Sequence, residues 1–220
     1  EAYHYYLQHN QLEEKIRQAL DELDSSDVKQ LALVGRQIRS WVLHAEMPEN
    51  LADEIVQAYE KLGEESHGYV GVAVRSSATA EDLPGASFAG QQETYLNISG
   101  RRNLLLTCKR VYASLFTDRA ISYRVHKGFK HMEVALSIGV QKMVRADTGS
   151  SGVMFTIDTE SGFDNVVLIN AAWGLGENVV QGAVNPDEFY VFKPTLTEGK
   201  APIVRRQLGS KAYRMVYSQD

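Results

Sequence analysis

The sequence contains a single cysteine, Cys108, among 220 residues. One thiol cannot form an internal disulfide and suits a reducing compartment, so we expect the cytoplasm. Cys108 lies among apolar residues at helical spacing, which favours a buried side chain over a nucleophile. No apolar run approaches the roughly 18 residues of a membrane-spanning helix, and no signal-peptide pattern is present. We therefore expect no membrane partner.

The chain also lacks an excess of positive charge. Its 28 aspartate and glutamate residues outnumber 23 lysine and arginine residues, which leaves a formal charge of −5. This balance argues against nucleic acid as a partner. An apolar content of 44% and a length of 220 residues suit an ordinary globular protein of one domain or two closely packed lobes.

Residues 1–64 are predicted to form a helical block without a catalytic constellation. Apolar residues recur at helical spacing in residues 12–23, 31–42 and 51–62. The segment Ser25-Ser26-Asp27 is the expected N-cap of the second stretch, Pro48 ends it, and Gly63 is the expected stop of the third.

The rest of the chain changes from helices to strands. Two further helices are predicted at residues 101–116 and 119–126, the second capped by Asp118. The predicted strands are residues 134–144, 152–157, 166–172, 188–193, 203–208 and 213–217. Helices followed by a mixed half with antiparallel-looking strands predict an α+β fold.

Residues 69–98 have the pattern of a strand, a long loop and a second strand. The first strand is expected to end at Arg75, followed by the small residues 76–80 and a Pro84–Gly85 turn. Small side chains let loop amides approach an anion, and a guanidinium offers paired donors to phosphate oxygens. A surface hairpin whose arginine pairs with Glu81 or Asp82 explains the same composition.

A longer pattern in this stretch is more specific. Residues 74–84, VRSSATAEDLP, followed by residues 87–94, SFAGQQET, resemble the phosphoenolpyruvate synthase and pyruvate phosphate dikinase family, which includes the rifampicin phosphotransferases. The resemblance covers nearly the whole chain. It implies an ATP-grasp-like domain, with a helical block followed by mixed or antiparallel sheet lobes, and it implies ATP and Mg²⁺ as ligands.

The resemblance also implies roles for individual residues. Arg75 matches the arginine that reaches the nucleotide phosphates, and we expect it to be catalytic. Gly90 and Thr94 match positions that line the nucleotide cleft. Gln141 matches the segment beside adenine, where an edge-strand backbone pairs with the ring and Met143 packs on its face. An ordinary strand glutamine is the alternative for Gln141.

The acidic residues of the second half leave alternatives open. Glu177 follows a buried strand in a glycine-rich segment, where it could hold a ribose hydroxyl or a magnesium-bound water, or equally could cap a helix. Asp158, Glu160 and Asp164 are close in sequence, but solvated loop carboxylates are the simpler interpretation. We therefore assign no metal ligand in this chain.

The implied reaction needs more than this chain. In the family, ATP gives its terminal two phosphates to a histidine of a carrier domain and releases AMP, water removes one phosphate, and the other passes to pyruvate. Residues 155–164 and 205–211 most resemble phosphoenolpyruvate synthases, which form phosphoenolpyruvate from ATP, pyruvate and water. A related dikinase, an antibiotic phosphotransferase of the rifampicin type and a non-catalytic docking domain are the alternatives.

We expect an incomplete nucleotide-binding domain. Residues 1–64 would be its helical segment, and residues 65–220 its phosphate-loop and adenine-binding portion. A Gly-Gly-Lys segment should precede Glu1, and Asp-x-Glu and Gln-x-Arg-Pro segments should follow Asp220. The carrier domain and the pyruvate site should belong to the same longer polypeptide, with a homodimer as a further expectation. Residues 81–91 are expected to form a lid over the phosphates.

Overall fold

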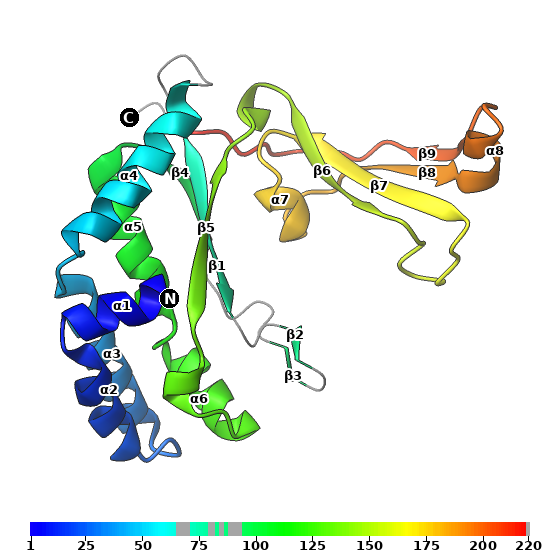
Figure 1. Cartoon of the computed structure of the whole chain (residues 1–220). Helices are drawn as coiled ribbons and strands as arrows, with labels where there is room; N and C mark the ends of the chain where they lie inside the picture. Colours follow the sequence, from blue (N-terminus) through cyan, green and yellow to red (C-terminus); the bar gives the residue numbers. More distant parts are fainter. Residues whose placement is uncertain (65–70, 79–81, 84–85, 88–93, 219–220) are drawn as a thin grey trace. The chain divides into compact units, whose positions relative to one another are not determined.

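The computed structural model describes residues 1–64, 71–78, 82–83, 86–87 and 94–218 (Figure 1). The chain divides into two compact units, Glu1–Met143 and Val144–Asp220. The helical block therefore shares a unit with the first sheet, whereas the sequence led us to group residues 65–220 together. Gly90 and most of the expected lid at residues 81–91 lie outside the described residues.

The helical block is confirmed. Its helices are α1 (Ala2–His9), α2 (Leu12–Asp21), α3 (Val28–His44) and α4 (Glu49–Glu64). Within the expected cap at residues 25–27, Asp27 caps α3, since its Oδ1 accepts hydrogen bonds from the amides of Lys29 at 2.9 Å and Gln30 at 3.2 Å. The expected stop at Gly63 is wrong, because α4 runs through it to Glu64. Packing of Tyr59 and Leu62 against the core offsets the weak helix propensity of glycine there.

Two further helices complete the first unit, α5 (Arg101–Ser114) and α6 (Asp118–Lys127). The expected cap at Asp118 is wrong by one residue. Thr117 caps α6 with its hydroxyl oxygen, which accepts from the amide of Ala120 at 3.2 Å, while Asp118 pairs with Arg39. None of the described helices is long and apolar enough to cross a membrane.

The first sheet has the strand order β4–β1–β5 and is antiparallel throughout. Its strands are β1 (Val72–Ala78), β4 (Thr94–Ile98) and β5 (Leu136–Lys142). The expectation that the first strand ends at Arg75 is wrong. Ser76, Ser77 and Ala78 pair with Ile138, Ser137 and Leu136. Cross-strand pairing thus extends β1 through residues whose own propensity for strand is weak.

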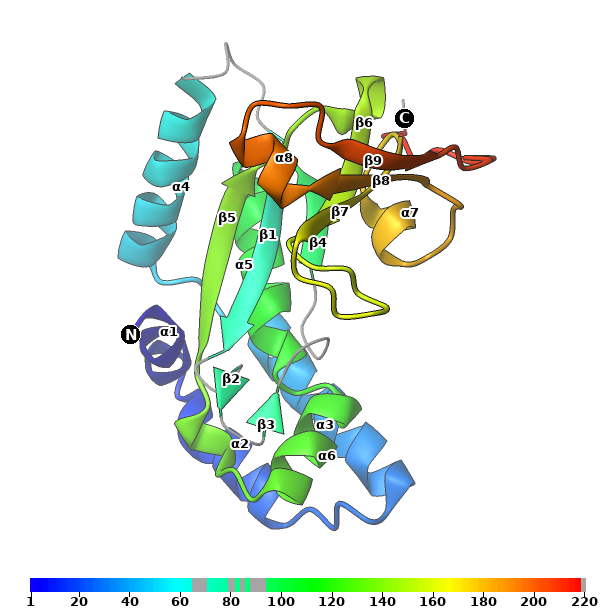
Figure 2. The same cartoon turned by 90° about the vertical axis from the view of Figure 1, so that its right-hand side faces the viewer.

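One face of this sheet packs on the helices. Val72 and Val74 of β1 are fully buried in one core with Leu104 and Val111 of α5. Figure 2 shows α5 running behind the sheet. Cys108 is also in this core, and burial raises the pKa of its thiol to about 11, which confirms it as a buried side chain rather than a nucleophile.

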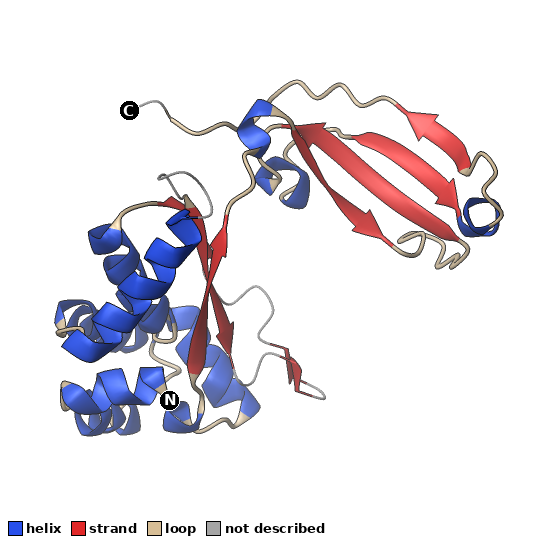
Figure 3. Ribbon diagram, turned by 45° about the horizontal axis from the view of Figure 1, so that its top comes forward, coloured by secondary structure: helices blue, strands red, loops and turns tan. Residues whose placement is uncertain are grey.

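The second unit is built on an antiparallel sheet with the strand order β6–β7–β8–β9 (Figure 3). Its strands are β6 (Ser150–Phe155), β7 (Val166–Trp173), β8 (Asp187–Phe192) and β9 (Ile203–Gln207), with the short helices α7 (Glu177–Val180) and α8 (Lys193–Thr197). The expected strand at residues 213–217 is wrong, because only Met215 makes a bridge, with Gly174. The two units together confirm the α+β class.

Candidate functional site

The first sheet has an open face that carries several of the predicted site residues. Arg75 lies inside β1 with Thr94 of β4 opposite it on one side and Gly139 of β5 on the other. All three are exposed, whereas Val74 beside Arg75 is fully buried. Because successive strand residues point to opposite faces, Thr94, Arg75 and Gly139 form one row on the face away from the helices.

Gln141 and Met143 extend this face along β5. Gln141 is exposed and lies opposite Ala73, two residues beyond Gly139 on the same strand, so it shares the open face. The sulfur of Met143 accepts a hydrogen bond from the amide of Asn97 at 3.0 Å, which brings the end of β5 close to β4. β5 is an edge strand of this sheet, as the expected pairing with adenine requires.

The charge of Arg75 is not neutralised by the described part of the chain. No carboxylate whose side chain the structure describes forms an ion pair with its guanidinium, and the side chain of Asp82, one of the alternative partners, is outside that part. Glu81, the other alternative partner, lies outside the described residues. An exposed guanidinium beside a threonine hydroxyl can bind a phosphate group through two parallel hydrogen bonds.

Glu177 belongs to the second unit and is the first residue of α7. Its Oε1 accepts a hydrogen bond from Nε2 of Gln181 at 2.9 Å, one turn later, and no side-chain cap is formed at Gly176. The preceding loop is held firmly: the hydroxyl of Ser151 donates to the carbonyl of Gly174 at 2.6 Å. The Glu177 carboxylate is therefore held by a hydrogen bond within its own helix, and it does not cap that helix.

In the acidic loop after β6, hydrogen bonds to Asp158 stabilise the turn. Asp158 accepts hydrogen bonds from the hydroxyl and amide of Ser161 and from the amide of Glu160, and these bonds hold the pKa of its carboxyl below the usual range. In the parts of the chain that the structure describes, no three histidine, cysteine, aspartate or glutamate side chains gather to hold a metal ion.

Two features of the first unit were missed from the sequence. A pocket of about 510 Å³ is lined in part by Arg110 of α5. Arg124 is fully buried and donates from Nε to Nδ1 of His131 at 2.9 Å. Burial lowers the pKa of Arg124 to about 10, and burial together with Arg124 lowers that of His131 to about 4. Helical spacing alone does not separate a buried arginine from an exposed one.

Comparison with known proteins identifies the class to which this fold belongs. The family model described as the pyruvate phosphate dikinase AMP/ATP-binding domain matches residues 1–220. The chain belongs to this family, which confirms the resemblance seen in the sequence.

Individual relatives within the family are phosphoenolpyruvate synthases. The chain is 60% identical over 219 residues to the phosphoenolpyruvate synthase of Neisseria meningitidis serogroup B, and 60% identical over 220 residues to that of Pseudomonas aeruginosa. It is 57% identical over 218 residues to that of Escherichia coli K12. These alignments cover 99–100% of the chain but only 27–28% of the relatives, so the chain spans about a quarter of their length.

Proposed function

We propose that this chain binds ATP on the open face of β4–β1–β5 as part of the nucleotide-binding domain of a phosphoenolpyruvate synthase. The observation that carries the proposal is the row of Thr94, Arg75 and Gly139, with Gln141 and Met143 beside it. A strand-borne arginine with no described acidic partner is suited to the phosphates, and an edge strand is suited to a base. Family membership over the whole chain supports ATP as the nucleotide.

Each site residue then has a defined task. Arg75 holds the phosphates that are transferred, and Thr94 and Gly90 line the cleft beside them. The backbone of β5 at Gln141 pairs with the polar edge of adenine, and Met143 packs on the ring. Glu177 of the second unit is assigned to a ribose hydroxyl or a magnesium-bound water.

Mg²⁺ is part of this proposal, although the described residues do not form a complete site for it. Magnesium commonly takes one or two protein carboxylates and completes its coordination with substrate phosphates and water. In this proposal Glu177 contacts a magnesium-bound water or a ribose hydroxyl, and no residue of this chain is assigned as a direct ligand of the ion. When bound, Mg²⁺ would neutralise phosphate charge; the chain itself positions ATP through Arg75 and the sheet.

The overall reaction of the longer enzyme would convert ATP, pyruvate and water to AMP, phosphoenolpyruvate and phosphate. A phosphohistidine carrier domain and a pyruvate site elsewhere in the polypeptide would complete it, in the cytoplasm and with a homodimer as the assembly. The 220-residue chain alone should turn over no ATP with pyruvate, because it holds no residue assigned to the carrier or acceptor steps. AMP formation above blank by the purified chain would contradict this assignment.

ATP binding can be tested directly on the chain. Titration of ¹⁵N-labelled protein with ATP should shift amide signals of β1, β4 and β5 and leave those of α2 unchanged. Arg75→Gln should reduce the shifts that inorganic pyrophosphate causes in β1 and β4, whereas Arg102→Gln, an exposed arginine on α5, should not. Absence of ATP-dependent shifts in the sheet, both in this chain and in a complete nucleotide-binding domain that contains it, would refute the proposed site and would favour the docking-domain alternative.

A further inference from the structure

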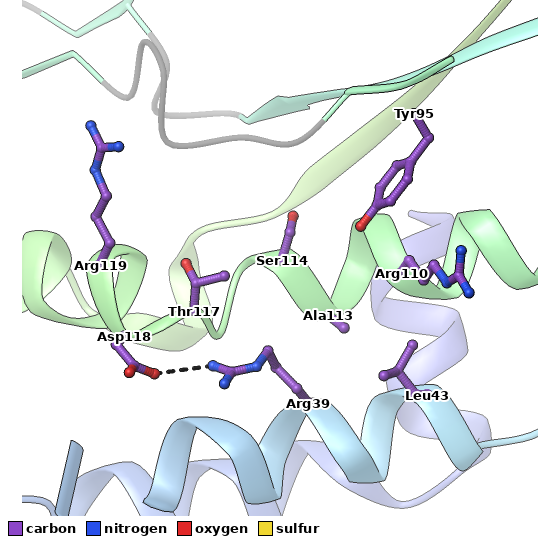
Figure 4. Close-up of a pocket in the computed structure, with 9 residues that line it drawn as sticks. All are labelled: Arg39, Leu43, Tyr95, Arg110, Ala113, Ser114, Thr117, Asp118 and Arg119. Atoms are coloured by element: carbon purple, nitrogen blue, oxygen red, sulfur yellow. Dashed lines mark hydrogen bonds and ion pairs between the residues drawn. The ribbon is translucent and has the colours of Figure 1, made fainter. Parts of the chain in front are cut away.

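The pocket of the first unit lies on the other side of β4 from the proposed nucleotide face. Tyr95, which lines it, follows Thr94 in the strand and therefore points to the opposite face, where it packs against the core. The other walls come from α3, α5 and the start of α6 (Figure 4). The lining residues are Arg39, Leu43, Tyr95, Arg110, Ala113, Ser114, Thr117, Asp118 and Arg119.

One side of the pocket is held in place by an internal ion pair. Nη1 of Arg39 lies 3.2 Å from Oδ1 of Asp118 and donates to the carbonyl of Phe116 at 2.6 Å. Gly35 makes room for this junction, since a β-carbon there would lie 2.9 Å from Oδ1 of Asp118 and 3.0 Å from Nη1 of Arg39. Arg39 is therefore structural, and its charge is already balanced.

The charges of the other two arginines, Arg110 and Arg119, are not balanced by an ion pair with a described residue. Arg110 lies on α5, Arg119 lies on α6, and both are exposed. Figure 4 shows their side chains at different ends of the pocket. Three arginines against one aspartate make this lining basic in a chain whose formal charge is −5. Such a local reversal of charge attracts anions.

The remaining lining groups suit a small ligand. Ser114 is buried and its hydroxyl donates to the carbonyl of Val111 at 2.6 Å, which leaves its oxygen able to accept. Thr117 accepts from the amide of Ala120, so its own hydroxyl proton remains to donate. Leu43 and Ala113 add an apolar wall. A volume of about 510 Å³ is in the range of small-molecule sites.

We propose that this pocket binds a small anion that carries more than one phosphate or carboxylate group, with Arg110 and Arg119 holding groups at its two ends. Guanidinium binds both kinds of oxyanion through paired, charge-assisted hydrogen bonds. The pocket differs from the ATP face at β4, because Tyr95 lines it from the face of the strand opposite to Thr94. Binding there does not depend on whether the open face of the sheet binds ATP.

Calorimetric titration of the 220-residue chain with citrate and with inorganic phosphate tests this proposal, with acetate at equal ionic strength as a blank. We expect saturable binding of at least one polyvalent anion, weakened at least about tenfold in the Arg110→Gln/Arg119→Gln double variant, as loss of two charge-assisted contacts requires. The matched control is Arg36→Gln/Arg102→Gln, which removes two exposed arginines from α3 and α5. Its affinity should stay within about twofold of the parent chain, because these side chains do not line the pocket.

Amide shifts of ¹⁵N-labelled protein locate the anion even if the double variant folds poorly. The titration should move the signals of Ala113, Ser114 and Thr117, and it should do so equally in Arg75→Gln. Equal loss of affinity in both double variants would mean non-specific attraction and would overturn the proposal. No saturable binding, or shifts confined to β1 and dependent on Arg75, would overturn it as well, the latter by assigning the anion to the nucleotide face.

Discussion

Replacement of Arg75 separates a role in phosphate transfer from a role in folding. Its side chain is exposed and makes no ion pair with a described carboxylate, while the strand around it is anchored by buried Val72 and Val74. Loss of an exposed, unpaired side chain changes stability by no more than about 0.5 kcal/mol. For a domain of this size that corresponds to a melting-temperature shift of about 2 °C or less.

The effect on turnover should be much larger. If Arg75 meets charge that develops on the transferring phosphates, Arg75→Ala in a full-length enzyme containing this domain should lower kcat by roughly two to three powers of ten, or about 2.7–4 kcal/mol. ATP affinity should fall much less. Arg75→Lys should recover only part of the rate, because an ammonium group cannot form the paired contact.

The assay is AMP formation from ATP and pyruvate, with ATP binding and a thermal melt measured on the same preparations. Arg102→Gln, on the surface of α5, is the matched control and should keep normal turnover. A correctly folded Arg75→Ala enzyme with kcat within a few-fold of the parent would place the phosphates elsewhere. A large drop in melting temperature would instead show that Arg75 pairs with an acidic neighbour for stability.

Three further predictions concern stability. Gly174→Ala should destabilise the second unit by roughly 2–4 kcal/mol in denaturant titrations. Gly174 has a φ of 80°, and a β-carbon there would lie 2.2 Å from the carbonyl oxygen of Met215. A change below about 1 kcal/mol would contradict this prediction. Gly139→Val should stabilise the first unit by about 0.5–1 kcal/mol, since among the described residues a β-carbon there meets only the Arg75 carbonyl oxygen at 4.0 Å, and valine favours a strand. A destabilised variant would show that the face is covered at this point. His131, whose pKa is lowered from 6.5 to about 4, binds a proton more readily when unfolded, so stability should fall as the pH drops from about 6.5 towards 4. Discounted for partial exposure, this loss is on the order of 1–2 kcal/mol and should be smaller in His131→Leu; identical pH profiles would refute it.

Local sequence determined most of the helices and the class of protein. The 3.6-residue spacing of apolar residues in residues 1–64 and the cap within residues 25–27 act within a few positions, so they can be predicted without a structure. The family assignment rested on a long run of small and polar residues around Arg75, a pattern that is recognised as a whole. Errors at Gly63 and Asp118 were local, where packing or a neighbouring hydroxyl outweighed propensity.

Only the tertiary structure decided which residues meet. Thr94 and Gly139 lie on either side of Arg75 because of strand register, which is a non-local property that no window of sequence contains. Pairing with β5 also carries β1 past Arg75 to Ala78, against the weak strand propensity of those residues. The packing of α3, α5 and α6 also placed Arg110 at a pocket and buried Arg124, which the local sequence does not reveal. The sequence determined the elements and the candidate residues. The packing of those elements determined which candidates share a face, because contacts between distant residues are not encoded in local preference.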